Sequence, residues 1–168
     1  MLILIGDLII PASLILLTWK ENLVRDNYTG LANRSPALFA AIALLCFGGL
    51  LWELGKIGLR RWPKKYWRKQ ILAETALILA AALMPYPKAE NFWSGLHVLL
   101  GYSAFVYLNI LLWQLGWDRP VLRGFYLAAL GICLSLCILA MSVTGLAETV
   151  YACMTSILLV QLDLSTQP

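Results

Sequence analysis

Long runs of apolar residues constrain the fold of this chain more than any other feature. The chain has 168 residues, of which 61% are hydrophobic and 13% are charged, whereas a soluble domain carries about 25% charged residues. Its mean hydropathy is +0.77, and a soluble domain of about 150 residues buries only about 70% of its surface. The sequence therefore excludes soluble enzymes, nucleic-acid-binding modules and disordered chains, and it predicts an integral membrane protein.

Each apolar run long enough to cross a bilayer predicts a transmembrane helix, because crossing requires about 20 residues. We expect an all-α, polytopic helical bundle that forms a single transmembrane domain over residues 1–168, with about six spans. The expected spans are 2–19, 37–55, 71–84, 94–115, 124–143 and 149–164.

The first and last spans need separate reasoning. The run 2–19 lacks the basic start and the cleavage site of a signal peptide, so we expect it to be retained. At the other end, a turn at Gly145 is expected to separate the last two spans. The alternative, one unbroken helix of about forty residues and five spans in all, is far longer than a bilayer requires.

Basic residues predict the orientation, because loops rich in Lys and Arg remain on the cytoplasmic side. The second and fourth loops hold nine of them: Lys56, Arg60, Arg61, Lys64, Lys65, Arg68, Lys69, Arg119 and Arg123. The first and third loops hold the other four: Lys20, Arg25, Arg34 and Lys88. We therefore expect the second and fourth loops to be cytoplasmic and, with six spans, both termini as well.

Tryptophans and small residues add expectations about packing. Five tryptophans fall near the expected span ends, where aromatic belts form at the membrane interface: Trp19, Trp62, Trp67, Trp93 and Trp117. The pair Gly48-Gly49 predicts close contact between helices.

Carboxylates within spans require an explanation, since inserting one at the bilayer centre costs about 2.5–3.5 kcal/mol. Asp7, Glu53, Glu74 and Asp163 fall toward the expected cytoplasmic ends of their spans. We expect them at interface depth, paired with the basic loop 56–69 or with each other. Glu74 follows that loop by one turn, and a carboxylate in the first turn of a helix is favoured by the macrodipole.

A second group of polar residues is expected at the outer side. His97, the only histidine, and Ser94 begin the fourth span, Glu148 begins the sixth, and Asp26 lies in the first loop. If the spans pack as one bundle, these side chains converge in an outward-facing polar pocket, and a histidine beside a carboxylate is a workable acid–base pair. The structural alternative is a histidine that is solvated or hydrogen-bonded to a loop carbonyl.

Aromatic residues follow on the same span. Tyr102, Phe105, Tyr107 and Trp113 form an aromatic surface that either lines a lipid groove or packs in the core. No metal site is expected, because zinc sites use more His or Cys ligands than one histidine provides. A single histidine also excludes a haem bound by two histidines of this chain, so we expect no cofactor other than lipid.

Three segments carry a resemblance to a known family. They are the polar stretch 26–36, the tetrapeptide Ser94-Gly95-Leu96-His97 and the pentapeptide Thr144-Gly145-Leu146-Ala147-Glu148. With the span order, they resemble the bacterial six-span membrane proteins of unknown function that look like relatives of the eukaryotic autophagy-modulator and GPI-lipid-remodelling proteins. The resemblance implies a six-span fold and a connection with lipids. Val98 and Thr149 depart from the family pattern, which often has a polar residue and an arginine at these places.

The first functional hypothesis is a small membrane protein that binds or handles a lipid or other hydrophobic ligand. The head group would contact His97, Glu148 and Asp26, and acyl chains would lie against the aromatic surface of the fourth span. The chain has no nucleophile elbow, metalloprotease, P-loop or Rossmann motif. We therefore expect binding rather than catalysis, and an enzyme that acts on lipid head groups is a subset of this hypothesis.

Two alternatives remain open from the sequence. One is an accessory or assembly subunit of a larger membrane complex, which would contact another membrane protein or anionic lipid. Its contact residues would be Arg60, Arg61, Lys64, Lys65, Arg68 and Lys69. The other is the substrate-binding subunit of a transporter. In each case the protein is multi-pass and integral to a cell membrane, with lipid or a membrane protein as partner and no nucleic acid.

Overall fold

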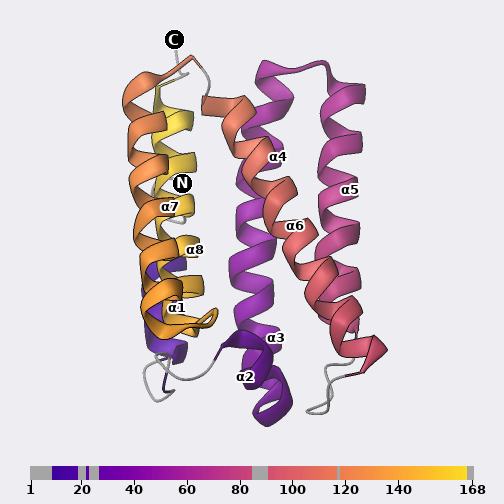
Figure 1. Cartoon of the computed structure of the whole chain (residues 1–168). Helices are drawn as coiled ribbons and strands as arrows, with labels where there is room; N and C mark the ends of the chain where they lie inside the picture. Colours follow the sequence, from indigo (N-terminus) through magenta and orange to yellow (C-terminus); the bar gives the residue numbers. More distant parts are fainter. Residues whose placement is uncertain (1–8, 19–21, 23–26, 85–90, 117, 166–168) are drawn as a thin grey trace. The chain divides into compact units, whose positions relative to one another are not determined.

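All the regular elements of the described chain are helices, as the sequence predicts. The computed structural model describes residues 9–18, 22, 27–84, 91–116 and 118–165. The elements are α1 (Ile10–Thr18), α2 (Tyr28–Arg34), α3 (Pro36–Ala43), the π-helical segment η2 (Leu44–Gly48), α4 (Gly49–Arg61), α5 (Lys64–Leu83), α6 (Phe92–Gly116), α7 (Pro120–Ala140) and α8 (Gly145–Leu164) (Figure 1).

The described residues fall into two compact units. Unit 1 comprises those of Met1–Glu53 and Arg119–Pro168, and unit 2 those of Leu54–Asp118. Each unit is described by itself below. The boundary lies within α4, whose first five residues belong to unit 1 and whose remaining residues belong to unit 2.

Among the described residues, four helical segments are long and apolar enough to cross a membrane. They are Pro36–Arg61, in which α3, η2 and α4 are continuous, and the helices α6, α7 and α8. At about 1.5 Å per residue, the 21 residues of α7 extend about 32 Å, close to the hydrocarbon thickness of about 30 Å. Length and hydropathy are therefore compatible with the predicted membrane protein.

The turn between the last two expected spans is present. The backbone N–H of Met141, whose φ of 53° is left-handed, donates to the Ile138 carbonyl, and that of Ser142 donates to the Cys137 carbonyl. This pair of bonds is the Schellman pattern that ends a helix. The Thr144 hydroxyl then accepts the backbone N–H of Ala147 at 3.2 Å and caps α8. As a result, α7 ends at Ala140, three residues before the expected end at 143. Helix α8 begins at Gly145, four residues before the expected start at 149.

The basic segment 56–69, expected to be a loop, is helical. Helix α4 continues through Arg61 and α5 begins at Lys64, so only Trp62 and Pro63 separate them. Lys and Arg are good helix formers, and Pro63 ends α4 because its ring and missing N–H are incompatible with a helix interior. Helix α5 therefore begins seven residues before the third expected span, at 64 and not at 71.

Trp67 packs the start of α5 against α4, so its expected place in an aromatic belt is wrong. Its side chain is 0% exposed, and its indole N–H donates to the Leu54 carbonyl at 3.2 Å. The ring fills the space beside Gly58, where a Cβ would lie 1.8 Å from Cε2 of Trp67. Trp62 and Trp93 are exposed, whereas Trp19 and Trp117 lie outside the described residues.

Helix α8 forms the centre of unit 1. In the most apolar 18-residue stretch of α8, 56% of the residues are buried, whereas in that of α7 only 17% are buried. Within the unit, α8 packs against α7 and α1. Figure 1 shows α7 and α8 side by side. The predicted close contact at the glycine pair is present at Gly49, where a Cβ would lie 2.6 Å from Cδ1 of Ile10, and absent at Gly48 among the described residues.

We predict that Gly58→Ala destabilises the protein, because the new methyl group would overlap the Trp67 indole. Overpacking of this kind costs about 1–3 kcal/mol, and we expect thermal unfolding in mild detergent to show a correspondingly lower midpoint. Gly55→Ala in the same helix is the matched control, since its Cβ would meet only Ile71 at 4.0 Å. An equal loss in both variants would contradict the packing described for Trp67.

Candidate functional site

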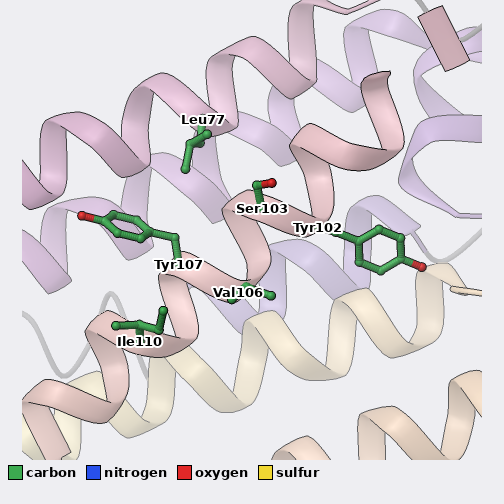
Figure 2. Close-up of a pocket in the computed structure, with 6 residues that line it drawn as sticks. All are labelled: Leu77, Tyr102, Ser103, Val106, Tyr107 and Ile110. Atoms are coloured by element: carbon green, nitrogen blue, oxygen red, sulfur yellow. The ribbon is translucent and has the colours of Figure 1, made fainter. Parts of the chain in front are cut away.

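Unit 2 contains a groove between α5 and α6, which we call the α5–α6 groove. Its volume is about 410 Å³, and it is lined by Leu77 of α5 and by Tyr102, Ser103, Val106, Tyr107 and Ile110 of α6. Figure 2 shows Leu77 pointing from α5 toward α6, with Tyr102 and Tyr107 extending from α6 in opposite directions. The volume is at the small end of the range for ligand pockets.

The groove has a polar border on the α5 side. The Tyr107 hydroxyl donates a hydrogen bond to Oε1 of Gln70. Gln70, Glu74 and Leu77 are spaced four and three residues apart, so they share one face of α5. Glu74 is 0% exposed, and neither of its carboxyl oxygens has a hydrogen-bond partner among the residues described.

This position of Glu74 corrects the expectation from the sequence. Glu74 was expected in the first turn of its helix, at interface depth, beside basic partners. Because α5 begins at Lys64, Glu74 is instead its eleventh residue and lies near the middle of the helix. Two other acidic residues expected at interface depth, Glu53 and Asp163, are buried in unit 1. There Glu53 accepts a hydrogen bond from the Ser156 hydroxyl at 3.4 Å.

The hydroxyl groups on the α6 side differ in how they are satisfied. The Ser103 hydroxyl donates to the Leu99 carbonyl one turn earlier, at 2.7 Å. Tyr102, by contrast, is 57% exposed. No other residue within the described ranges forms a hydrogen bond with its hydroxyl. Tyr102 therefore presents an exposed hydroxyl that can donate and accept, and Figure 2 shows its ring extending away from Tyr107.

Helix geometry separates the predicted ligand residues of the fourth span. His97 and Tyr102 are five residues apart, which corresponds to about 140° around an α-helix. His97 shares its side of α6 with the buried residues Ala104 and Leu108, whereas Trp113 lies seven residues after Val106, on the groove side. Of the predicted ligand residues, only Tyr102 lines the groove.

Ser94 has a local structural role. Its hydroxyl accepts the backbone N–H of Asn91 at 3.0 Å, and the Asn91 side chain accepts the backbone N–H of Ser94 at 3.0 Å. This reciprocal pair is a capping box at the start of α6. It satisfies backbone donors that the first turn of a helix leaves without partners.

Glu148 joins α2 to α8 in unit 1, at what we call the α2–α8 junction (Tyr28, Glu148 and Thr149). Its carboxylate accepts the backbone N–H of Tyr28 at 2.8 Å, while the Tyr28 hydroxyl and the Thr149 hydroxyl are hydrogen-bonded at 2.7 Å. Glu148 also lies in the first turn of α8, where the macrodipole favours a negative charge. A purely structural role accounts for its contacts.

The convergence of His97, Glu148 and Asp26 stays a prediction. His97 belongs to unit 2 and Glu148 to unit 1, and Asp26 lies outside the described residues.

The predicted basic contact residues lie at the end of α4 and the start of α5. Arg61 donates to the Leu115 carbonyl and pairs with Asp118 at 3.2 Å, so it fixes the end of α4 to the end of α6. The remaining members of the set are exposed: Arg60, Lys64, Lys65, Arg68 and Lys69. No three His, Cys, Asp or Glu residues of the described chain are grouped so as to hold a metal ion.

Sequence reasoning missed Gln70, Glu74 and Leu77 as one functional face. The spacing of these three residues predicts a shared helix face, but only if the helix begins before them, within the basic segment 56–69. With α5 starting at 71, Gln70 belonged to a loop and Glu74 to a helix end. Pro63, which marks where α5 begins, was the residue that could have corrected this.

No protein-family model, no curated protein and no solved structure matches this chain.

We predict that Tyr28→Phe lowers the free energy of unfolding by about 1 kcal/mol, because the bond to Thr149 is lost while the Thr149 hydroxyl keeps the Gly145 carbonyl as acceptor. Burial raises the pKa of Tyr28 above its ordinary value near 10. The folded state therefore favours the neutral phenol, and stability from this group is present below about pH 10 and lost above it.

The difference in the free energy of unfolding between wild type and Tyr28→Phe should accordingly become smaller as the pH rises from about 8 to about 11. Thermal unfolding in detergent at both pH values measures it. Tyr66→Phe, at an exposed position of α5, serves as the control and should change little. A gap that widens at alkaline pH would contradict the burial of the phenol.

Proposed function

We propose that this protein is a multi-pass membrane protein that binds a lipid or other hydrophobic ligand, with its hydrocarbon chain in the α5–α6 groove. The observation that supports this most directly is the position of the groove on α6, which is long and apolar enough to cross a membrane. Val106 and Ile110 in its wall are exposed. In a bilayer, these side chains would face hydrocarbon, the environment from which a lipid chain enters.

Tyr102 gives a second line of support. It is the eleventh of the 25 residues of α6, so in a spanning helix it lies about 15 Å from the end. A hydroxyl without a hydrogen-bond partner is costly in hydrocarbon. A ligand with an ester, hydroxyl or amide group near the start of its chain would satisfy Tyr102 while its chain lies along Val106. The resemblance to lipid-related membrane proteins is consistent with such a ligand.

We further propose the six-span topology, with the ends of the chain in the cytoplasm. Helix α5 has 20 residues, a length of about 30 Å, of which the apolar part 70–83 would enter the bilayer. Its first turns carry Lys64, Lys65, Arg68 and Lys69, which favour the cytoplasmic interface. Glu74 is then the charged side chain at depth in this span.

The accessory-subunit hypothesis remains the competing function. The exposed basic residues at the start of α5 form its contact surface, and the positive-inside bias accounts for the same residues without a partner. Neutralising Lys64 and Lys65 should leave ligand binding in the groove unchanged and should weaken assembly only if the competing function holds.

Filling the groove should abolish ligand binding. We predict that Val106→Trp reduces the amount of lipid retained in native mass spectrometry by at least about tenfold, because the indole occupies the volume of the chain. Tyr102→Phe, which removes one hydrogen bond of about 0.5–1.5 kcal/mol, should weaken binding roughly 2- to 12-fold. Leu127→Trp, at an exposed apolar position of α7, is the matched control and should retain the wild-type lipid. Equal retention in Val106→Trp and wild type would reject the groove as the site.

Single cysteines test the topology. In a variant whose four native cysteines are replaced, Ser142→Cys in the α7–α8 turn should react with a membrane-impermeant maleimide added to intact cells, whereas Lys65→Cys should react only after permeabilisation. Leu134→Cys, exposed on α7, should be protected by lipid in both conditions. Labelling of the positions 65 and 142 from one side would overturn the proposed arrangement.

A further inference from the structure

The buried carboxyl group of Glu74 lacks the hydrogen-bond donors that a carboxylate requires. Its side chain is fully buried, and both oxygens are without a hydrogen-bond partner among the described residues. The polar neighbour across the helix interface, Tyr107, uses its hydroxyl proton for Gln70. The other acidic residue described in unit 2, Asp118, is exposed and paired with Arg61. Glu74 is therefore the unusual carboxyl group of this unit.

Glu74 lies on the same face of α5 as the residue of that helix that lines the groove. Leu77, three residues later on the same face of α5, lines the groove. Four residues earlier, Gln70 accepts the hydrogen bond of Tyr107, which lines the groove from α6. Because Glu74 is fully buried and is not one of the residues that line the groove, a polar end must enter between Leu77 and Tyr107 to reach its carboxyl group.

We propose that the α5–α6 groove selects a single-chain amphiphile with a primary amine, whose ammonium group pairs with Glu74. This inference rests on the proposed binding of a hydrocarbon chain in the groove and names the class of its polar end. An ammonium group has three N–H donors and a positive charge. It supplies donors to both carboxyl oxygens and compensates a charge that is costly to bury alone.

The chemistry of the groove distinguishes this ligand from related amphiphiles. A long-chain alcohol offers one donor and no charge, so it leaves one carboxyl oxygen without a donor. A quaternary ammonium has charge but no donor, and aromatic side chains rather than a carboxylate are its usual partners. The volume of about 410 Å³ favours one chain over two.

The test compares three probes with the same chain: dodecylamine, dodecanol and dodecyltrimethylammonium. Each is titrated into protein reconstituted in nanodiscs of a zwitterionic phospholipid, and empty nanodiscs correct for partition into the bilayer. For the wild type we expect dodecylamine to bind at least about tenfold more tightly than either other probe. Glu74→Gln should reduce dodecylamine binding to the level of dodecanol and leave dodecanol binding unchanged. Glu53→Gln, which neutralises a buried glutamate of unit 1, should behave as wild type.

The outcomes separate this inference from the proposed function. If dodecanol and dodecylamine bind equally to the wild type, and Val106→Trp abolishes both, the groove binds chains and the amine inference is overturned. If no probe binds in a manner that depends on Val106, the proposed function itself fails. If dodecyltrimethylammonium bound more tightly than dodecylamine, the role of Glu74 would also be overturned. The preference for a cation would then be assigned to the tyrosines of the groove.

A second measurement uses the wild type alone, in case Glu74→Gln does not fold. Dicyclohexylcarbodiimide modifies carboxyl groups in apolar surroundings, and peptide mapping locates the adduct. We expect modification of Glu74, with half-protection by dodecylamine at a concentration at least about tenfold lower than that of dodecanol. Equal protection by the two probes would overturn the inference.

Discussion

A backbone in an apolar environment must find hydrogen-bond partners within the protein, and the arrangement of this molecule depends on that requirement. Helix interiors meet it automatically, but helix ends do not. Here side chains complete several of them. Thr144 caps α8, Asn91 and Ser94 cap α6, and Arg61 binds a carbonyl in the last turn of α6. These caps explain why short polar residues lie where an apolar chain changes direction.

Two glutamates at helix contacts, the half-buried Glu148 and the buried Glu74, illustrate different uses of a carboxyl group. Glu148 receives the backbone N–H of Tyr28, which would otherwise lack a partner at the start of α2, so its charge contributes to joining two elements. Glu74 has no corresponding donor in the described chain. Since leaving a carboxyl group unsatisfied weakens the fold, Glu74 costs stability where Glu148 contributes to it.

The sequence was sufficient for the helical class and for the turn near Gly145. It was insufficient where charge and secondary structure disagree. The lysines after Pro63 predicted a loop because they are charged, yet they are strong helix formers and continue α5. That error moved Glu74 to a helix end and concealed its relation to Leu77. Trp67 was misplaced for a different reason, since only the folded chain shows that Gly58 makes room for its ring.

The π-helical segment η2 has a consequence for how this protein tolerates changes in length. A π-helical turn holds one residue more than an α-helical turn, and such turns occur as local bulges within otherwise regular helices. Loss of one residue from Leu44–Gly48 would leave a continuous α-helix of 25 residues, about 38 Å long, with both flanks in their present register. This segment can therefore absorb a deletion that elsewhere in Pro36–Arg61 would turn every following side chain by about 100°.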